Sequence, residues 1–131
     1  MIPERLEPHT FALMRIVFGL MYMSYGLLKL GLLGSPAVEL ASLLGAAAVI
    51  EAFIGPLIAM GLLTRPLAFI ASGEMAAAYF IAHQPHGTWP VQNQGVPAVL
   101  FCFAFLHIAA QGAGIWSLDY ARTRREPKTS P

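Results

Sequence analysis

Residues 70–119 read IASGEMAAAYFIAHQPHGTWPVQNQGVPAVLFCFAFLHIAAQGAGIWSLD. The stretch predicts an apolar helix, a short loop rich in His, Pro and Trp, and a second apolar helix. Glu74 falls in the middle of the first helix and His107 falls well inside the second. A carboxylate in the middle of a membrane-length apolar segment costs several kcal/mol unless it has a partner or water. We therefore expect the rest of the chain to supply polar partners for these side chains.

The amino-acid composition indicates that the outer surface of the protein faces lipid. Of the 131 residues, 56% are hydrophobic and only 11% are charged, whereas about a quarter of the residues of a soluble domain are charged. A chain of this kind cannot cover an aqueous surface, so we expect the lipid bilayer to be its main partner. The net charge of +1 gives no indication of a nucleic-acid partner. The single cysteine, Cys102, excludes an intramolecular disulfide and a Cys-x-x-Cys relay.

Four apolar segments have lengths near the roughly 20 residues that cross the hydrocarbon core. They cover residues 11–33, 40–63, 66–83 and 97–115. The predicted fold class is therefore all-α, an antiparallel four-helix bundle within a membrane. We expect one transmembrane domain, residues 11–121, between a short polar lead at 1–10 and a basic tail at 122–131.

The distribution of basic residues predicts the orientation of these spans. Four spans place both termini on one side of the membrane. That side collects Arg5, Arg65, Arg122, Arg124, Arg125 and Lys128. The opposite side has at most Lys29, so the positive-inside rule predicts cytoplasmic termini and an external loop at 84–95.

The first span carries a polar face with small residues. Arg15, Gly19, Tyr22, Gly26 and Lys29 recur at spacings of four and three, which places them on one side of a helix. Glycines on such a face allow a neighbouring helix to approach closely. The two basic side chains could instead extend along the helix toward opposite membrane surfaces, and for Lys29 we favour this interpretation.

Two mid-membrane acids are the candidate partners of Arg15. At about 1.5 Å per residue, Arg15 lies within reach of Glu51 or Glu74, whereas Lys29 approaches Glu51 less readily. Such a pair could simply hold the bundle together. Because ionisable groups inside a membrane are functional-site candidates, we favour a polar pocket between the helices that binds a proton or a small polar molecule. Its predicted residues are Arg15, Tyr22, Lys29, Glu51, Glu74 and His107.

The predicted external loop adds a second group of candidates, formed by His83, His86, Trp89 and Asn93. His83 and His86 are three residues apart, but Pro85 intervenes and no third ligand is evident, so we predict no metal site. A bis-histidine haem site is disfavoured because His107 and His83 lie at different depths.

Ordered motifs along nearly the whole chain resemble the DoxX family of small four-helix bacterial membrane proteins. They are Arg15, GLLK at 26–29, Glu51, GLLTR at 61–65, EMAAAYF at 74–80, HQP at 83–85, GTWP at 87–90, Asn93, GAG at 112–114 and SLD at 117–119. Family members often have Asn-Gly-Gly-Glu where this chain has NQGV at 93–96, so a carboxylate is missing at the outer end of the fourth helix. They also often have Gly-Pro-Gly where this chain has GAG.

The resemblance implies a multi-pass protein of the bacterial cytoplasmic (inner) membrane. It also implies association with quinone-linked respiratory enzymes or with redox-defence proteins. The leading hypothesis is a membrane subunit that supplies a pocket for a quinone or other small molecule, while a redox partner protein supplies the electrons. No covalent cofactor is expected, and a stand-alone catalyst is disfavoured because the sequence carries no flavin, haem, iron–sulfur or dithiol motif.

Two other functions fit the same residues. The first is a proton-linked carrier built around Glu51 and Glu74, which would need to work as a homo-oligomer because one short bundle hardly encloses a path. The second is a structural membrane anchor whose basic tail binds a cytoplasmic protein. Recovery of bound quinone and a redox partner from native membranes would favour the leading hypothesis over both.

Overall fold

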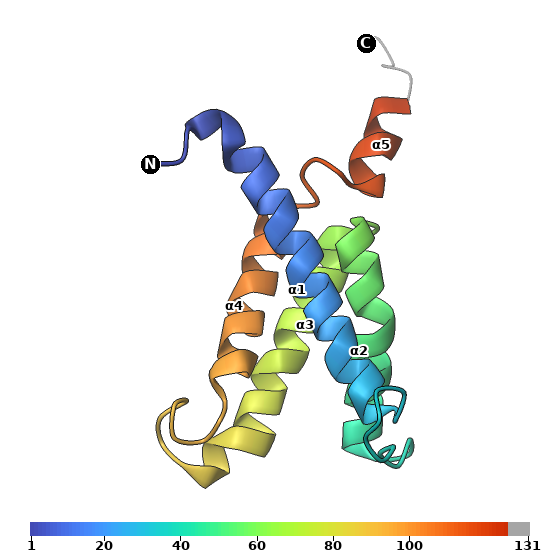
Figure 1. Ribbon diagram of the computed structural model, residues 1–131, viewed down its shortest axis with the longest axis vertical. Helices are drawn as coiled ribbons and strands as arrows, with labels where there is room; N and C mark the ends of the chain where they lie inside the picture. The colour runs from blue at the N-terminus through green and yellow to red at the C-terminus, as the bar shows by residue number, and fades with distance from the viewer. Residues whose placement is uncertain (126–131) are drawn as a thin grey trace.

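The chain, seen here in a computed structural model, is described for residues 1–125, in which all regular secondary structure is helical (Figure 1). The predicted all-α class is confirmed. Residues 126–131 of the predicted basic tail lie outside the described part. The α-helices are α1 (Glu7–Lys29), α2 (Leu43–Met60), α3 (Thr64–Ala78), α4 (Val96–Gln111) and α5 (Leu118–Arg125). Shorter segments are the 3₁₀-helices η1 (Glu4–Leu6) and η3 (Gln84–His86) and the π-helix η2 (Tyr79–His83).

Two helical segments of the described chain, Glu4–Lys29 and Leu43–Met60, are long and apolar enough to cross a membrane. The shorter α4 is also apolar. In Figure 1 the direction of the chain alternates from α1 to α4, so the connections 30–42 and 84–95 lie at one end. The N-terminus and α5 lie at the other end, which we call the terminal end.

The helix ends differ from the predicted spans because local capping decides them. Pro8 stands in the first turn of α1, where its missing N–H costs nothing, so this helix begins earlier than residue 11. Ser42 caps α2 by accepting a hydrogen bond from the Gly45 N–H at 3.0 Å, so α2 begins later than residue 40. Gly112, with φ at 89°, ends α4 four residues before the predicted limit.

Glycines bring α1 and α2 into close contact, as the sequence predicted. A Cβ atom added to Gly19 would lie 2.8 Å from the carbonyl oxygen of Gly55. One added to Gly26 would overlap the backbone of Ala52. The two helices therefore touch backbone to backbone along one line, which fixes their relative position.

Replacing Gly26 by leucine is expected to force α1 away from α2 and to destabilise the protein by about 1–3 kcal/mol or more. The measurement is thermal unfolding of the detergent-purified protein, followed by circular dichroism. Gly73→Leu is the matched control, because a Cβ at Gly73 meets nothing within 4 Å. Equal loss of stability in both variants would contradict the assigned contact.

The apolar core lies where α1 and α2 face α3 and α4. Its buried members are Tyr22, Ile58, Ala68, Ala71, Met75, Phe101, Phe105 and Ile108. Phe53, Phe69, Phe80 and Phe103 face outward. Phe101 and Phe105 are buried instead, because they pack on the Tyr22 ring with centroids 6.0 and 4.9 Å away.

Candidate functional site

The predicted pairing of Arg15 with Glu51 or Glu74 is wrong. Arg15 is fully buried, and its guanidinium turns toward the end of the molecule that holds the N-terminus and α5. It donates hydrogen bonds to four carbonyl oxygens: those of Ile58 (2.9 Å), Ala59 (2.6 Å), Ile115 (3.2 Å) and Trp116 (2.7 Å). Arg15 therefore connects α1 to the last turn of α2 and to the segment after α4.

Two more side chains complete the connections at this end. The Arg65 guanidinium donates to the carbonyls of Ala109 (3.1 Å), Ala110 (2.5 Å) and Gln111 (3.2 Å), the last turn of α4. The Asp119 carboxylate accepts from the backbone N–H groups of Leu63 (3.0 Å) and Thr64 (2.9 Å), at the start of α3. Cations suit a helix C-terminus and anions an N-terminus.

The surroundings of Asp119 also change its protonation. Partial burial raises the pKa of this carboxyl, but the hydrogen bonds from Thr64 and Leu63 and the charge of Arg122 outweigh burial. The pKa therefore lies below its ordinary value, and Asp119 remains a charged cap at neutral pH. Arg15, Arg65 and Asp119 hold this end of the fold together, which is a structural role.

At the opposite end, Lys29 forms an ion pair with Glu51. Its Nζ atom lies 2.6 Å from Glu51 Oε1. The Lys29 side chain is 23% exposed and that of Glu51 only 1%. The prediction that Lys29 extends toward the nearer membrane surface is thus wrong. The second oxygen, Glu51 Oε2, is buried and has no hydrogen-bond partner among residues 1–125, so the carboxylate retains an unused acceptor.

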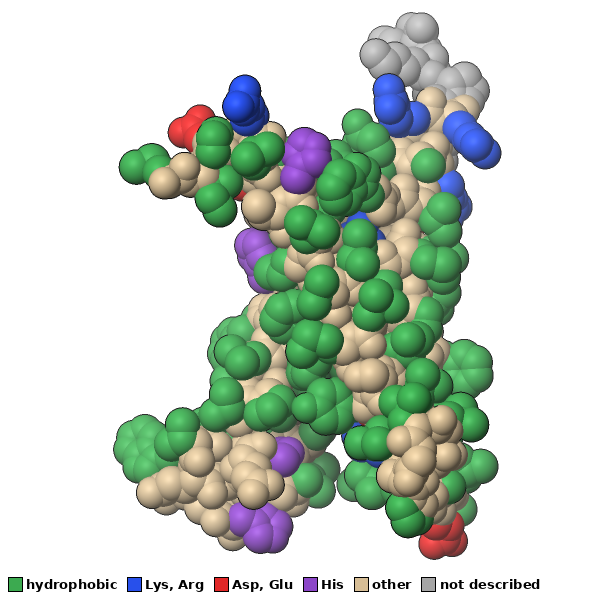
Figure 2. Space-filling view, viewed as in Figure 1, with side chains coloured by type: hydrophobic (Ala, Val, Ile, Leu, Met, Phe, Trp, Pro, Cys, Tyr) green, Lys and Arg blue, Asp and Glu red, His purple; other side chains and the backbone are tan. Residues whose placement is uncertain are grey.

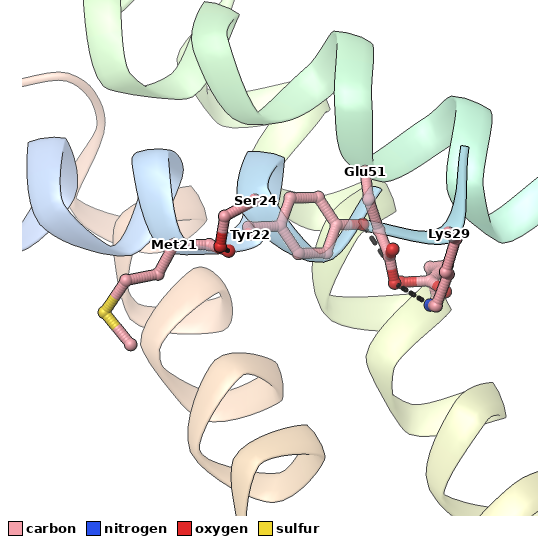
Figure 3. A network of polar contacts seen from close by, with 6 residues as sticks. Met21, Tyr22, Ser24, Lys29 and Glu51 are labelled. Atoms are coloured by element: carbon pink, nitrogen blue, oxygen red, sulfur yellow. Dashed lines mark hydrogen bonds and ion pairs between the residues drawn. The ribbon is translucent and has the colours of Figure 1, made fainter. Parts of the chain in front are cut away.

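Tyr22, which lines the same part of the molecule as this pair, contacts the other acid, Glu74. Its hydroxyl donates a 3.0 Å hydrogen bond to Glu74 Oε2. Figure 3 shows the Tyr22 ring, the Glu51 carboxylate and the Lys29 ammonium converging between α1 and α2. Four of the six residues predicted for a polar pocket therefore meet here: Tyr22, Lys29, Glu51 and Glu74.

A cavity of about 210 Å³ adjoins this cluster. Its lining comes from α1–α4, η2 and the loop before α4, and consists of Tyr22, Tyr25, Lys29, Glu51, Met75, Ala78, His83, Gln94, Pro97, Ala98 and Phe101. We call it the inter-helix cavity. It lies toward the end opposite the termini, and Figure 2 shows that the molecule is hollowed at that end. The cavity combines aromatic walls with two charged residues, Lys29 and Glu51.

His107 and Arg15, the other two predicted pocket residues, do not belong to this cavity. His107 is exposed on α4, and its ring packs edge-on against Phe11 with centroids 5.7 Å apart. It lines a different groove of about 620 Å³ with Glu7, Pro8, Thr10, Phe11, Met14, Gln111 and Gly114. The prediction that His107 faces inward is wrong because the buried face of α4 is formed by Ala98, Phe101, Phe105 and Ile108.

The predicted outer-loop group separates into two parts. Asn93 is buried and organises the loop by donating to the Gly87 carbonyl at 2.9 Å and accepting from the Gly95 N–H at 2.9 Å. His83 Nδ1 lies 3.1 Å from the Asn93 carbonyl, and His83 also lines the cavity. His86 and Trp89 are exposed and lie away from it. No cluster of three or more His, Cys, Asp or Glu side chains occurs in residues 1–125.

Sequence reasoning missed Tyr25, Gln94 and Phe101 as cavity residues. For Tyr25 a signal was present, since it stands three residues after Tyr22 and four before Lys29, on the same helical face. Phe101 and Gln94 carried no comparable signal, because their positions depend on how α4 and its preceding loop pack against α1.

Comparison with known proteins defines the family. The DoxX family model matches residues 10–84. The chain belongs to the DoxX family. It is also 35% identical over 124 residues to an uncharacterized protein of Haemophilus influenzae, covering 88% of this chain and 92% of the relative. No solved structure matches the chain. Family membership, with two membrane-length apolar helices, indicates a membrane protein, and the resemblance of the sequence motifs to DoxX is confirmed.

Proposed function

We propose that this DoxX protein is the membrane subunit of a quinone-linked redox system and binds a quinone headgroup in the inter-helix cavity. The observation that carries the proposal is the free Oε2 acceptor of Glu51 beside the Lys29 ammonium. An ammonium has three donors, and only one is used by Glu51. The pair therefore offers a donor for a quinone carbonyl and an acceptor for a quinol hydroxyl.

The shape and walls of the cavity support the same ligand. A volume of about 210 Å³ is below the 300–1,000 Å³ typical of pockets for drug-sized molecules, and it suits a single substituted ring. Tyr22, Tyr25 and Phe101 provide aromatic faces against which a flat ring can stack. The electrons come from a partner protein, and the cavity positions the ring and exchanges its protons through Glu51.

The test is binding of a short-tailed ubiquinone analogue to the purified protein in detergent. Glu51→Gln/Glu74→Gln is expected to fold and purify but to bind the analogue at least about tenfold more weakly, because a charge-assisted hydrogen bond is lost. Glu39→Gln is the matched control, since Glu39 is an exposed acid at the same end of the molecule. Native affinity in the double variant would contradict the site.

The membrane arrangement is part of the proposal. We place α1–α4 across the bacterial inner membrane with both termini in the cytoplasm. The Arg residues at the terminal end support this orientation, and α3 continues through η2 to residue 83, a helical length of about 30 Å. In a Cys102→Ala background, Gly87→Cys is expected to react with a membrane-impermeant maleimide in intact cells and Thr129→Cys is not. The opposite pattern would reverse the orientation.

A proton-linked carrier is the second candidate function. The chain of contacts from Lys29 through Glu51, with Glu74 and Tyr22 beside it, provides two carboxylates that could exchange protons with a small solute. This function predicts proton movement into vesicles that contain only this protein. The redox-subunit proposal predicts none, so the same reconstituted vesicles distinguish the two.

A further inference from the structure

Helix α5 is fixed to the body of the molecule although none of its residues is buried. The Asp119 N–H donates to the Gly61 carbonyl at 2.9 Å, and the Asp119 carboxylate caps α3 as described above. Ser117 Oγ accepts from the Tyr120 N–H at 3.1 Å. Asp119, Tyr120 and Thr123 line a groove together with Thr64 and Arg65. The side of α5 that carries Asp119 and Thr123 thus faces the body. Tyr120 borders the groove and is also exposed, and the remaining sides of the helix face outward.

The outward sides combine apolar and basic residues. Leu118 shares a helical stripe with Arg122 and Arg125, which follow it by four and seven positions. On a second stripe, the Arg124 guanidinium lies 5.7 Å from the centroid of the Tyr120 ring. Leu118 and Tyr120 are each 46% exposed, and the preceding Trp116 is 55% exposed.

The basic residues of α5 form no ion pair within residues 1–125, where the only ion pair is Lys29–Glu51. The charge of Arg122 acts on Asp119, but the two side chains do not form an ion pair. Figure 2 shows Lys and Arg side chains gathered over α5 at the terminal end of the molecule. A positive patch beside exposed aromatic residues remains.

We propose that α5 and Trp116 form a binding surface for anionic phospholipid headgroups. The proposal rests on the membrane placement above. A helix of eight residues is about 12 Å long, and the headgroup layer on each side of the hydrocarbon core is roughly 5–8 Å thick. With Trp116, Leu118 and Tyr120 at the hydrocarbon boundary, the arginines of the last turn lie among the phosphates. An acidic protein would not require exposed aromatic and apolar residues at the base of the helix, whereas the membrane interface favours them.

The chain contains its own fluorescent probe for this surface. It has two tryptophans, so Trp89→Phe leaves Trp116 as the sole one. The variant is reconstituted in phosphatidylcholine vesicles that contain phosphatidylglycerol as the anionic lipid. Two vesicle preparations are compared, both with the two lipids at equal mole fraction. In one, only the phosphatidylglycerol carries brominated acyl chains; in the other, only the phosphatidylcholine does. The measurement is the quenching of Trp116 fluorescence in each preparation.

Quenching by brominated phosphatidylglycerol is expected to correspond to a local concentration of this lipid around Trp116 about fivefold above that of phosphatidylcholine. A ratio of about five corresponds to the free energy with which one arginine is attracted to an anionic membrane surface. Replacing Arg122, Arg124 and Arg125 by glutamine should bring the two lipids to equal quenching, as should high salt. Arg5→Gln, at the same end but on η1, is the control and should preserve most of the preference.

Equal quenching by both lipids with the arginines intact would overturn the lipid surface while leaving the membrane placement in place. A preference that survives the triple substitution would overturn it as well. Absence of quenching by either lipid would show that Trp116 lies away from the bilayer. This result would contradict the membrane placement, and with it the lipid surface that depends on it. Capture of an acidic protein by α5 together with equal lipid quenching would assign the surface to that protein instead.

Discussion

Replacing Arg15 by leucine is expected to destabilise the protein by at least about 3 kcal/mol, because four carbonyl groups on two segments lose their charged donor at once. The variant leaves the carbonyls of Ile58, Ala59, Ile115 and Trp116 without their common partner. It should also loosen the segment after α4, so that α5 loses its fixed position. The measurements are thermal unfolding in detergent and hydrogen exchange of residues 112–120.

Two further variants distinguish this role from a simple requirement for positive charge. Arg15→Lys keeps the charge, but one ammonium cannot reach four carbonyls on two segments, so it should recover only part of the stability. Arg65→Leu should cost less, since Arg65 is exposed and the carbonyls it leaves can bind water. A stable Arg15→Leu variant would contradict the contacts described here.

The direction of helical side chains explains why sequence reasoning paired the wrong charges. Estimates of depth along a helix placed Arg15 within reach of the acids and left Lys29 near the surface. On an α-helix, however, each Cα–Cβ bond tilts toward the helix N-terminus. Arg15 is therefore directed toward the terminal end, away from Glu51, and Lys29 is directed back into the molecule toward it. Both corrections follow from this one geometric rule.

Other parts of the structure could be predicted from the spacing of residues alone. The recurrence of Gly19 and Gly26 on one face of α1 predicted the close contact with α2, because glycines repeated along one side of an apolar helix leave its backbone open to a neighbour. Which face of α4 is buried could not be predicted in this way. Its sequence is apolar on nearly every side, so nothing in the pattern indicated that Phe101 would be buried and His107 exposed. Only packing against α1 and α3 decides which face is inside.

The structure assigns the family motifs to two groups with different roles. Arg15, Arg65 and Asp119 hold the terminal end through hydrogen bonds to helix ends, and these contacts require no ligand. Lys29 and Glu51 instead line the inter-helix cavity. A charged pair beside a cavity can contact a small ligand there. For this reason the second group is the better candidate for function.

Separating stability from function at the Lys29–Glu51 pair requires a double-mutant cycle. Lys29→Met is expected to cost about 3–5 kcal/mol, since it leaves a buried carboxylate without its cation. Glu51→Leu should cost less, because Lys29 is 23% exposed and its flexible side chain can carry the ammonium toward water. In the double variant, replacement of both charges by apolar side chains should restore stability to near the native value. Thermal unfolding in detergent measures the stability of the native protein, the two single variants and the double variant.

Binding of the ubiquinone analogue, measured on the same four proteins, should not follow stability. The double variant is expected to unfold like the native protein and yet to bind the analogue at least about tenfold more weakly, because both the donor and the free acceptor are gone. Additive losses of stability in the two single variants would show that the charges are not coupled. A stable double variant with native affinity would show that the pair only holds α1 against α2, and the ligand site would have to be sought elsewhere in the molecule.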